Sequence, residues 1–316
     1  TWSHAYSRQL RRCRYVNPPA RNGRVGSLAG VPNKPSGLCM LPGGVLAITS
    51  CAISTRGVQF VAAFNGSDPQ ALAACRASSL ASRHFEWPMG LVLTNDGLLV
   101  CNAYHSRSPT ALYKFAKNGS MDQLATVPAL ADYDRGFTRC AVHQQTQRTY
   151  AIGETKGGDQ ALVLLDTNLQ VITTVEATSG STDDANYEPI CDVAVHGDQV
   201  IALTSDHHPK GSGLRLLDLN GRLLRTIAAG QFRCPCAMTA SHGRAFVVDD
   251  YDHDDVEQGQ GNMLHVIDIQ SGDILQTVRL ELQGGVSEIL VDGDEIYIAG
   301  SGPGEVVVLH FAGSEA

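Results

Sequence analysis

Short runs of hydrophobic residues, each following a polar turn, recur along the whole chain of 316 residues. Six of these runs start at residues 45, 98, 150, 200, 245 and 296, so that about 50 residues separate each run from the next. The runs are Val45–Ile48, Leu98–Val100, Tyr150–Ile152, Val200–Leu203, Ala245–Val248 and Ile296–Ile298. Similarity at a fixed interval predicts a repeat architecture in which every repeat is one small structural unit.

Each repeat has the same order of predicted strands and turns. In the second repeat, a strand at Gly90–Leu93 precedes Asn95-Asp96-Gly97, whose Asp-Gly pair suits a tight hairpin. The second strand follows, then a polar loop, a third strand such as Leu112–Phe115, and a fourth strand such as Leu223–Ile227. Ala71–Ala81 is interpreted as a fourth strand followed by a loop, because no segment keeps a helical period over three turns. The pattern predicts an all-β fold, a six-bladed β-propeller of four-stranded antiparallel blades.

The last repeat is incomplete, because Val286–Phe311 supplies only three predicted strands. A propeller must close its ring or leave two sheet edges exposed. Gly23–Leu28 resembles the missing fourth strand, so we expect this N-terminal strand to complete the sixth blade and close the ring. Residues 1–21 then form an arm, and residues 22–316 form a single propeller domain.

The stretch from Trp87 to Asn102, with His105, Arg107 and Leu112–Phe115 after it, resembles the NHL-repeat family of six-bladed propellers. Pro35-Ser36-Gly37-Leu38 and Leu214–Ile227 repeat parts of that pattern. The resemblance covers essentially the whole chain at the level of the blade pattern. It implies a ring of six blades, with a ligand or partner bound on one face.

The charge is distributed unevenly. The formal net charge is −8, but residues 1–35 carry +7 and the remaining residues therefore carry −15. This balance argues against a nucleic-acid partner, because such binding relies on neutralising phosphates. We expect the arginines of the arm to contact an acidic surface, including that of a second copy of the chain. The expected assembly residues are Arg8, Arg11, Arg12 and Arg14.

Polar residues gather in the loops between second and third strands and in the loops between blades. In a propeller these loops open on one face, around the mouth of the central channel, so that face is the expected binding site. The candidate binding residues are His105, Arg107, Asp132, Tyr133, Asp134, Asp206, His207, His208, Tyr251 and His253.

Two kinds of metal site are compatible with these loops. Asp250, Asp252 and Asp254 alternate along one loop and could collect calcium, although the loop lacks the EF-hand pattern and a solvated acidic loop is the favoured interpretation. The histidines His105, His207, His208 and His253 would suit zinc, as a resemblance to propeller-type amidating lyases implies. A resemblance to calcium-dependent lactonases directs attention to carboxylates at the first-strand entries: Glu188, Asp192 and Glu288.

Nine cysteines are many for a cytosolic chain of this length, and the odd number leaves at least one without an intramolecular partner. Cys191 and Cys236 occupy equivalent starts of first strands, where a small buried side chain fits the channel wall. Asn65 and Asn118 begin Asn-Gly-Ser sequons in predicted turns, which suit N-glycans and are also ordinary turn sequences. Together these features favour a secreted or cell-surface protein, with a cytoplasmic one as the alternative.

No apolar run reaches the roughly 18 residues of a membrane span, and no nucleophile elbow or phosphate loop is present. The sequence therefore favours a non-catalytic propeller that binds a protein partner or other copies of itself. The alternative is a metal-dependent hydrolase or lyase, lactonase-like or amidating-lyase-like, with its site at the channel mouth.

Overall fold

The computed structural model describes residues 28, 30–52, 56–63, 67–77, 85, 87–103, 111–116, 123–128, 136–154, 160–176, 189–205, 212–249, 262–280, 282, 284–301 and 304–310. Within these residues almost all regular structure is antiparallel β-strand, and α2 (Pro69–Ala77) is the helix of this part. No helix of the described part has the length and apolarity needed to cross a membrane.

Hydrogen bonds join the described strands into five sheets. The first sheet contains β1 (Pro35–Leu41), β2 (Val45–Ser50) and β3 (Gly57–Ala62). The second has eight strands: β4 (Trp87–Leu93), β5 (Gly97–Ala103), β6 (Ala111–Ala116), β7 (Gln123–Pro128), β8 (Gly136–His143), β9 (Arg148–Glu154), β10 (Gln160–Leu165) and β11 (Val171–Glu176). It consists of two four-stranded units, β4–β7 and β8–β11, that join at the residue pair Ala103 and Gly136.

The remaining sheets repeat the same order of strands. The third contains β12 (Ile190–His196), β13 (Gln199–Thr204), β14 (Gly213–Asp218) and β15 (Leu223–Ile227). The fourth contains β16 (Pro235–Ser241), β17 (Arg244–Asp249), β18 (Met263–Asp268) and β19 (Ile274–Arg279). The fifth contains β20 (Val286–Asp292), β21 (Glu295–Gly300) and β22 (Val306–His310).

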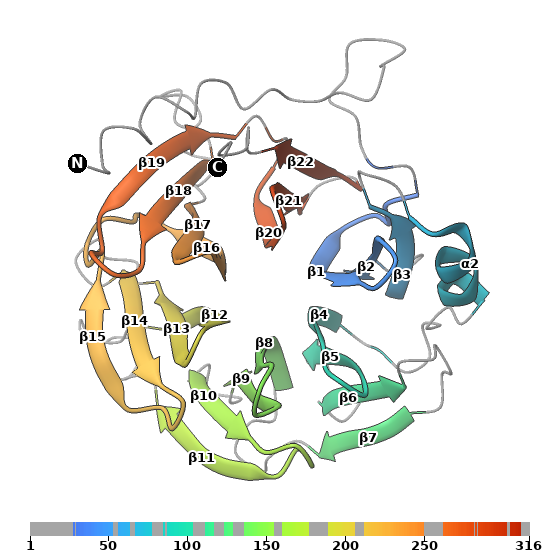
Figure 1. Ribbon diagram of the computed structural model, residues 1–316, viewed down its shortest axis with the longest axis horizontal. Helices are drawn as coiled ribbons and strands as arrows, with labels where there is room; N and C mark the ends of the chain where they lie inside the picture. Colours follow the sequence, from blue (N-terminus) through green and yellow to red (C-terminus); the bar gives the residue numbers. More distant parts are fainter. Residues whose placement is uncertain are drawn as a thin grey trace.

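The strand units are arranged around a central axis, and β1, β4, β8, β12, β16 and β20 lie nearest to it (Figure 1). Each of these inner strands contacts the next, and β20 contacts β1. A separate hydrophobic cluster fills the space between each unit and its neighbour. One cluster packs Leu46 and Val61 of the first unit against Tyr297 of the last. The apolar core is therefore a set of layers between units, which hold the units together around the axis.

The predicted strand pattern is confirmed where the structure describes it. The six runs that define the repeat all lie in second strands of their units, and their side chains are almost completely buried. The predicted fourth strand Leu223–Ile227 coincides with β15. Burial on both faces explains why these second strands are continuous apolar runs without alternation.

The interpretation of Ala71–Ala81 as a strand and loop is wrong, because helix α2 begins at Pro69 (Figure 1). Proline suits the first helical position, since its missing N–H would have no partner there. Asp68 caps the helix, with Oδ1 accepting a hydrogen bond from Gln70 N at 2.9 Å. The helix then packs Ala71 and Leu72 against the cluster between the first and second units.

The N-terminal residues predicted to close the ring, Gly23–Ser27, lie outside the described residues, as does the arm of residues 1–21.

Candidate functional site

A β-bulge near the start of every inner strand sets which side chains face the central axis. The register of each inner strand against its second strand shifts by one residue at this point. In each inner strand, the equivalent residue lies two positions after the last residue before the shift. These six residues are Gly37, Gly90, Arg139, Asp192, Ala237 and Glu288. Three have almost no side chain, and the other three carry charge.

The small residues allow the inner strands to approach one another closely. A Cβ atom at Gly90 would lie 2.9 Å from Arg139 Cα, and one at Gly37 would lie 2.2 Å from the carbonyl oxygen of Met89. Both distances are far inside van der Waals contact, so a larger residue at either position would push inner strands apart. The three charged side chains stand at the remaining equivalent positions, apart from Ala237.

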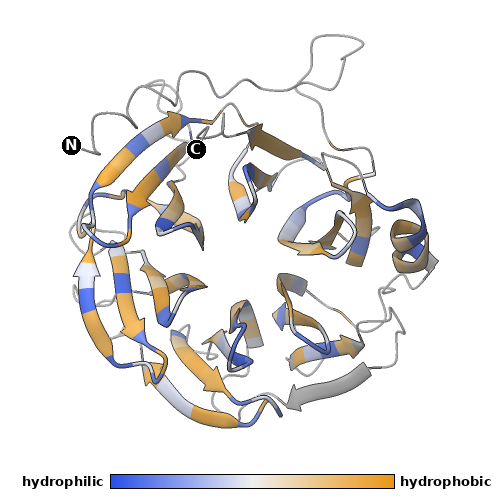
Figure 2. Ribbon diagram, viewed as in Figure 1, coloured by the Kyte–Doolittle hydropathy of each residue, from blue (hydrophilic) through white to orange (hydrophobic). Residues whose placement is uncertain are grey.

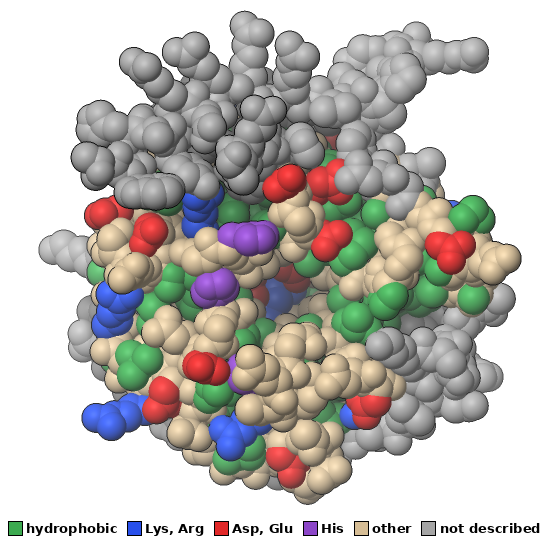
Figure 3. Space-filling model, in the orientation of Figure 1, with side chains coloured by type: hydrophobic (Ala, Val, Ile, Leu, Met, Phe, Trp, Pro, Cys, Tyr) green, Lys and Arg blue, Asp and Glu red, His purple; other side chains and the backbone are tan. Residues whose placement is uncertain are grey.

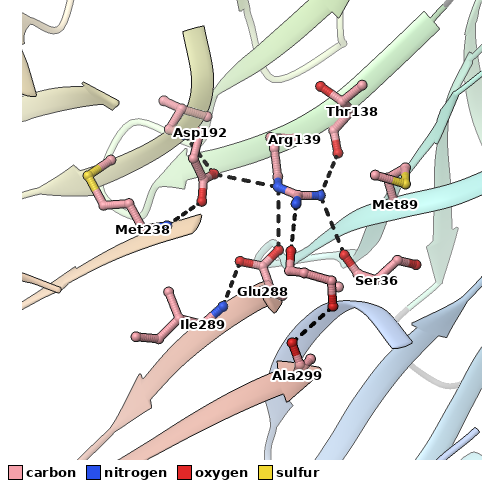
Figure 4. Close-up of polar contacts among 12 residues, drawn as sticks. Ser36, Met89, Thr138, Arg139, Asp192, Met238, Glu288, Ile289 and Ala299 are labelled. Carbon is pink, nitrogen blue, oxygen red and sulfur yellow. Dashed lines mark hydrogen bonds and ion pairs between the residues drawn. The ribbon is translucent and has the colours of Figure 1, made fainter. Parts of the chain in front are cut away.

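Arg139, Asp192 and Glu288 form a cluster that we call the hub cluster (Figure 4). Arg139 Nε lies 3.8 Å from Asp192 Oδ1 and 3.8 Å from Glu288 Oε2. The side chains of Arg139, Asp192 and Glu288 are 9%, 4% and 11% exposed. Figure 3 shows a central hollow with charged side chains of both signs at its base. The hub cluster is therefore a buried charge group at the centre of the ring of inner strands.

The guanidinium group of Arg139 donates to backbone carbonyl groups on three strands. Nη2 donates to Ser287 O on β20 at 2.6 Å. Nη1 lies 3.4 Å from Ser36 O on β1 and 3.3 Å from Thr138 O on β8. Nε, in contrast, has no hydrogen-bond partner among the described residues and faces the two carboxylates at the longer distance. Arg139 thus connects its own strand to the strands on both sides of the β20–β1 contact.

The two carboxylates differ in their hydrogen bonds. Asp192 accepts from two backbone amides, Val193 N to Oδ1 at 2.8 Å and Met238 N on β16 to Oδ2 at 2.6 Å. Glu288 accepts from one, Ile289 N to Oε1 at 3.1 Å. Asp192 is therefore the better stabilised of the two as a charged carboxylate, because hydrogen bonds to a carboxylate favour its ionised form.

One guanidinium group cannot compensate two buried carboxylates equally. Burial raises the pKa of Glu288 to about 8; Arg139 acts in the opposite direction, while Asp192 raises this pKa further. Burial raises the pKa of Asp192 to about 6, again against the effect of Arg139 and of the two amides. Burial alone would lower the pKa of Arg139, but Glu288 and Asp192 together raise it, so the guanidinium group stays charged. Near neutral pH the favoured state has one charged carboxylate and one proton on Glu288.

Cysteine thiols surround the hub cluster. Burial raises the pKa of Cys39 to about 12 and also raises that of Cys191. The pKa of Cys140 is raised by a hydrogen bond with Cys101 and by burial. These four residues are free thiols, and a thiol that stays protonated is a poor nucleophile. The expected equivalence of Cys191 and Cys236 is confirmed, since both lie at the bulges of their strands.

The hub cluster contains two of the three carboxylates that the lactonase resemblance singled out, Asp192 and Glu288, while Glu188 lies outside the described residues. The guanidinium group of Arg139 stands between them, in the place where a metal ion would have to bind. No group of three or more histidine, cysteine or acidic side chains in the described residues is suited to hold a metal. Sequence reasoning missed Arg139, because nothing in the linear pattern indicates which residue follows a bulge.

The other predicted site residues lie outside the described residues. These are the binding-face residues His105, Arg107, Asp132, Tyr133, Asp134, Asp206, His207, His208, Tyr251 and His253, and the acidic residues Asp250, Asp252 and Asp254. The same holds for the sequon residues Asn65 and Asn118 and for Arg8, Arg11, Arg12 and Arg14 of the arm. Their roles stay predictions.

Comparison with known proteins yields structural likeness only. No protein-family model and no curated protein matches the chain. A structural-genomics protein of unknown function from Bacteroides thetaiotaomicron is 12% identical, with a TM-score of 0.60 over 90% of this chain and 71% of that one. A chain of a mitotic checkpoint complex is 11% identical, with a TM-score of 0.51 over 89% of this chain and 77% of that one.

A third solved structure, BamB from Moraxella catarrhalis, is 14% identical, with a TM-score of 0.49 over 88% of this chain and 86% of that one. At these identities a likeness concerns the fold alone. Taken with the strand order described above, the likenesses to the first two structures identify the chain as an all-β protein with a β-propeller fold.

Proposed function

We propose that the chain is a non-catalytic interaction module, a six-bladed propeller that binds a protein partner through its outer strands. The observation that carries this proposal is a group of exposed apolar side chains on β11, β15 and β19, which we call the outer belt. Its members are Val171, Ile172, Leu223, Leu224 and Leu275, between 40% and 52% exposed. They are all of the large hydrophobic residues that are exposed in the described part of the chain.

The outer belt lies on consecutive units. β11, β15 and β19 follow one another along the rim, and hydrophobic residues recur along them (Figures 1 and 2). Each belt residue is among the first two of its strand, directly after the turn that precedes the strand. Single exposed hydrophobic residues are ordinary, but a group confined to neighbouring elements is typical of a contact surface.

The backbone of these strands adds a second reason. β11, β15 and β19 each stand at the end of the strand order of their sheet, so no described strand pairs with their outer edges. An exposed edge offers N–H and C=O groups to an added strand, which is one recurrent mode of peptide recognition. The buried hub cluster also favours the non-catalytic role. Its polar groups bind one another and backbone groups, and they do not form a pair of nucleophile and base.

A double variant tests the outer belt. Leu223→Ser with Leu224→Ser removes two half-exposed apolar side chains, and we expect the free energy of unfolding to change by less than about 1 kcal/mol in total. The measurement is affinity capture with quantitative mass spectrometry. The double variant should capture about tenfold less of each protein that the unchanged chain binds, which is equivalent to about 1.4 kcal/mol of binding free energy.

The matched control is Asp292→Ser with Asp294→Ser, two exposed residues at the β20–β21 hairpin, and it should capture the same proteins as the unchanged chain. Equal capture by all three proteins would contradict the role of the outer belt. Sedimentation of the purified chain then shows whether the partner is a second copy of the chain or a different protein.

We also propose that the six units form one closed ring, with Gly23–Leu28 as the fourth strand of the last unit. The contact of β20 with β1 and the apolar cluster between the last and first units support this arrangement. A place within the NHL-repeat family, assembly through the arginines of the arm, and a secreted or cell-surface location with N-glycans remain proposals from the sequence.

A further inference from the structure

The hub cluster connects all of the inner strands. Arg139 on β8 donates to Ser36 O on β1 and Ser287 O on β20, and Asp192 on β12 accepts from Met238 N on β16. Ser36 extends the connection to β4, because its Oγ donates to Pro88 O at 2.6 Å. Ser287 Oγ donates to Pro35 O at 2.6 Å and so crosses directly between β20 and β1. The contact of β20 with β1, which we call the seam, is where the first and last described units meet.

The charges of the hub cluster are unequal in number. Two carboxylates face one guanidinium group, and all three side chains are buried or nearly so. An uncompensated charge in such a place is costly, so a proton should neutralise one carboxylate. Glu288 has one amide hydrogen bond where Asp192 has two, and it is also the more exposed. These differences assign the proton to Glu288.

We propose that Glu288 is a proton-operated switch of the seam: it holds a proton near neutral pH, and losing that proton in mildly alkaline solution weakens the packing of β20 against β1. Ionised Glu288 repels Asp192 and competes with it for Arg139. Arg139 is at the same time the donor to both strands of the seam. A shift of the guanidinium group toward either carboxylate therefore acts on the two hydrogen bonds that Arg139 donates to the backbone carbonyls of Ser36 and Ser287, one on each strand of the seam.

Glu288 lies on a strand packed against elements that carry other titratable groups. Cys39 of β1 and Cys140 of β8 interact with it electrostatically, but burial and hydrogen bonding raise the pKa of both thiols. Among the other strands packed against β20, β17 carries Asp249, which accepts hydrogen bonds from the backbone amides of Arg233 and Cys234. β21 contributes Glu295, which accepts a hydrogen bond from Tyr297, and β16 contributes Cys236.

The direction of the effect follows from proton linkage. The pKa of Glu288 in the folded chain, about 8, lies above the ordinary value of 4.5, so the folded state binds the proton more tightly than the unfolded state. The contribution of Glu288 to stability is therefore fully present below about pH 4.5 and is lost as the pH rises through 8. Asp192 behaves in the same sense but titrates near 6, so the change above pH 7 belongs to Glu288.

Hydrogen exchange measured by mass spectrometry on the whole chain tests the switch. After correction for intrinsic exchange rates, protection of β1 and β20 should fall by up to about a hundredfold between pH 6 and pH 9, because the pKa of Glu288 near 8 lies two pH units above the starting pH. β13, in a unit remote from the seam, should change by less than about twofold. Glu288→Gln keeps the size of the side chain and removes its titration, and in this variant the seam should lose its pH dependence.

Asp294→Asn serves as the control, since Asp294 is an exposed carboxylate in the hairpin after β20 and should leave the response unchanged. The proposal is overturned if Glu288→Gln responds to pH as the unchanged chain does. It is equally overturned if the unchanged chain shows no fall from pH 6 to pH 9, or if all units lose protection together. The last two outcomes are measured on the unchanged chain, so the proposal can be overturned even if Glu288→Gln folds poorly.

Discussion

At the scale of single residues, the close packing of the inner strands depends on glycine at positions where a side chain would not fit. Gly90→Ala adds a methyl group 2.9 Å from Arg139 Cα and 3.0 Å from Thr138 O, both of them backbone atoms that cannot turn aside. We expect the free energy of unfolding to fall by about 1–3 kcal/mol, the usual cost of overpacking. Urea denaturation measures this loss. Gly300→Ala is the matched control, because its nearest atom would lie 3.8 Å away, and equal losses in both variants would refute the explanation.

Arg139 makes the opposite kind of contribution, through its charge. Arg139→Met leaves Asp192 and Glu288 without their counter-charge and removes the bonds to Ser36 and Ser287. Breaking a buried ion pair by removing one partner costs about 3–5 kcal/mol. Adding Asp192→Asn to Arg139→Met should restore part of this loss, because Asp192 is the carboxylate that stays charged at this pH and it has lost its counter-charge. Chemical denaturation of the single and double variants at pH 7.5 gives the comparison, and no recovery would show that the arginine acts only through its backbone hydrogen bonds.

At the scale of the strands, burial determines what the sequence could predict. The second strands are buried on both faces, so each contains an unbroken apolar run, such as Val45–Ile48 in the fully buried β2 (Val45–Ser50), and these strands were found from the sequence. Helix α2 was missed because nine residues are too few for a convincing helical period, and its stability comes from the Asp68 cap and from packing on the first two units. The local signal was Asp68-Pro69, a cap followed by a proline at the first helical position.

The register of the strands explains why the site was only partly predictable. Asp192 and Glu288 were singled out through the resemblance to calcium-dependent lactonases, which directs attention to carboxylates at the starts of first strands. Arg139 could not be singled out, because a bulge of one residue decides whether a side chain faces the axis or the neighbouring unit. The consequence is chemical as well as structural: two carboxylates suggested a metal, whereas the arginine between them makes the group a connection between strands.

At the scale of the whole molecule, stability is divided among the apolar layers between neighbouring units. Consecutive units are also linked by the chain, except at the seam, where the last unit meets the first through side-chain packing, hub-cluster bonds and Ser287 Oγ. Any strand added to β22 by the N-terminal residues would strengthen this junction in particular. The seam is therefore where a truncation should have its largest effect.

Two truncations separate the proposed arm from the proposed closing strand. Removing residues 1–21 should leave the melting temperature within about 1 °C of the full chain, because it leaves Gly23–Leu28 in place. Removing residues 1–27 should lower it by about 4 °C or more, since the outer edge of β22 (Val306–His310) would lose a partner and become exposed. Calorimetry of both proteins at the same pH and concentration gives the comparison. A fall of the same size in both would place the stabilising contacts in the arm, and no fall in either would leave the hub cluster and the apolar layer at Tyr297 sufficient to hold the seam.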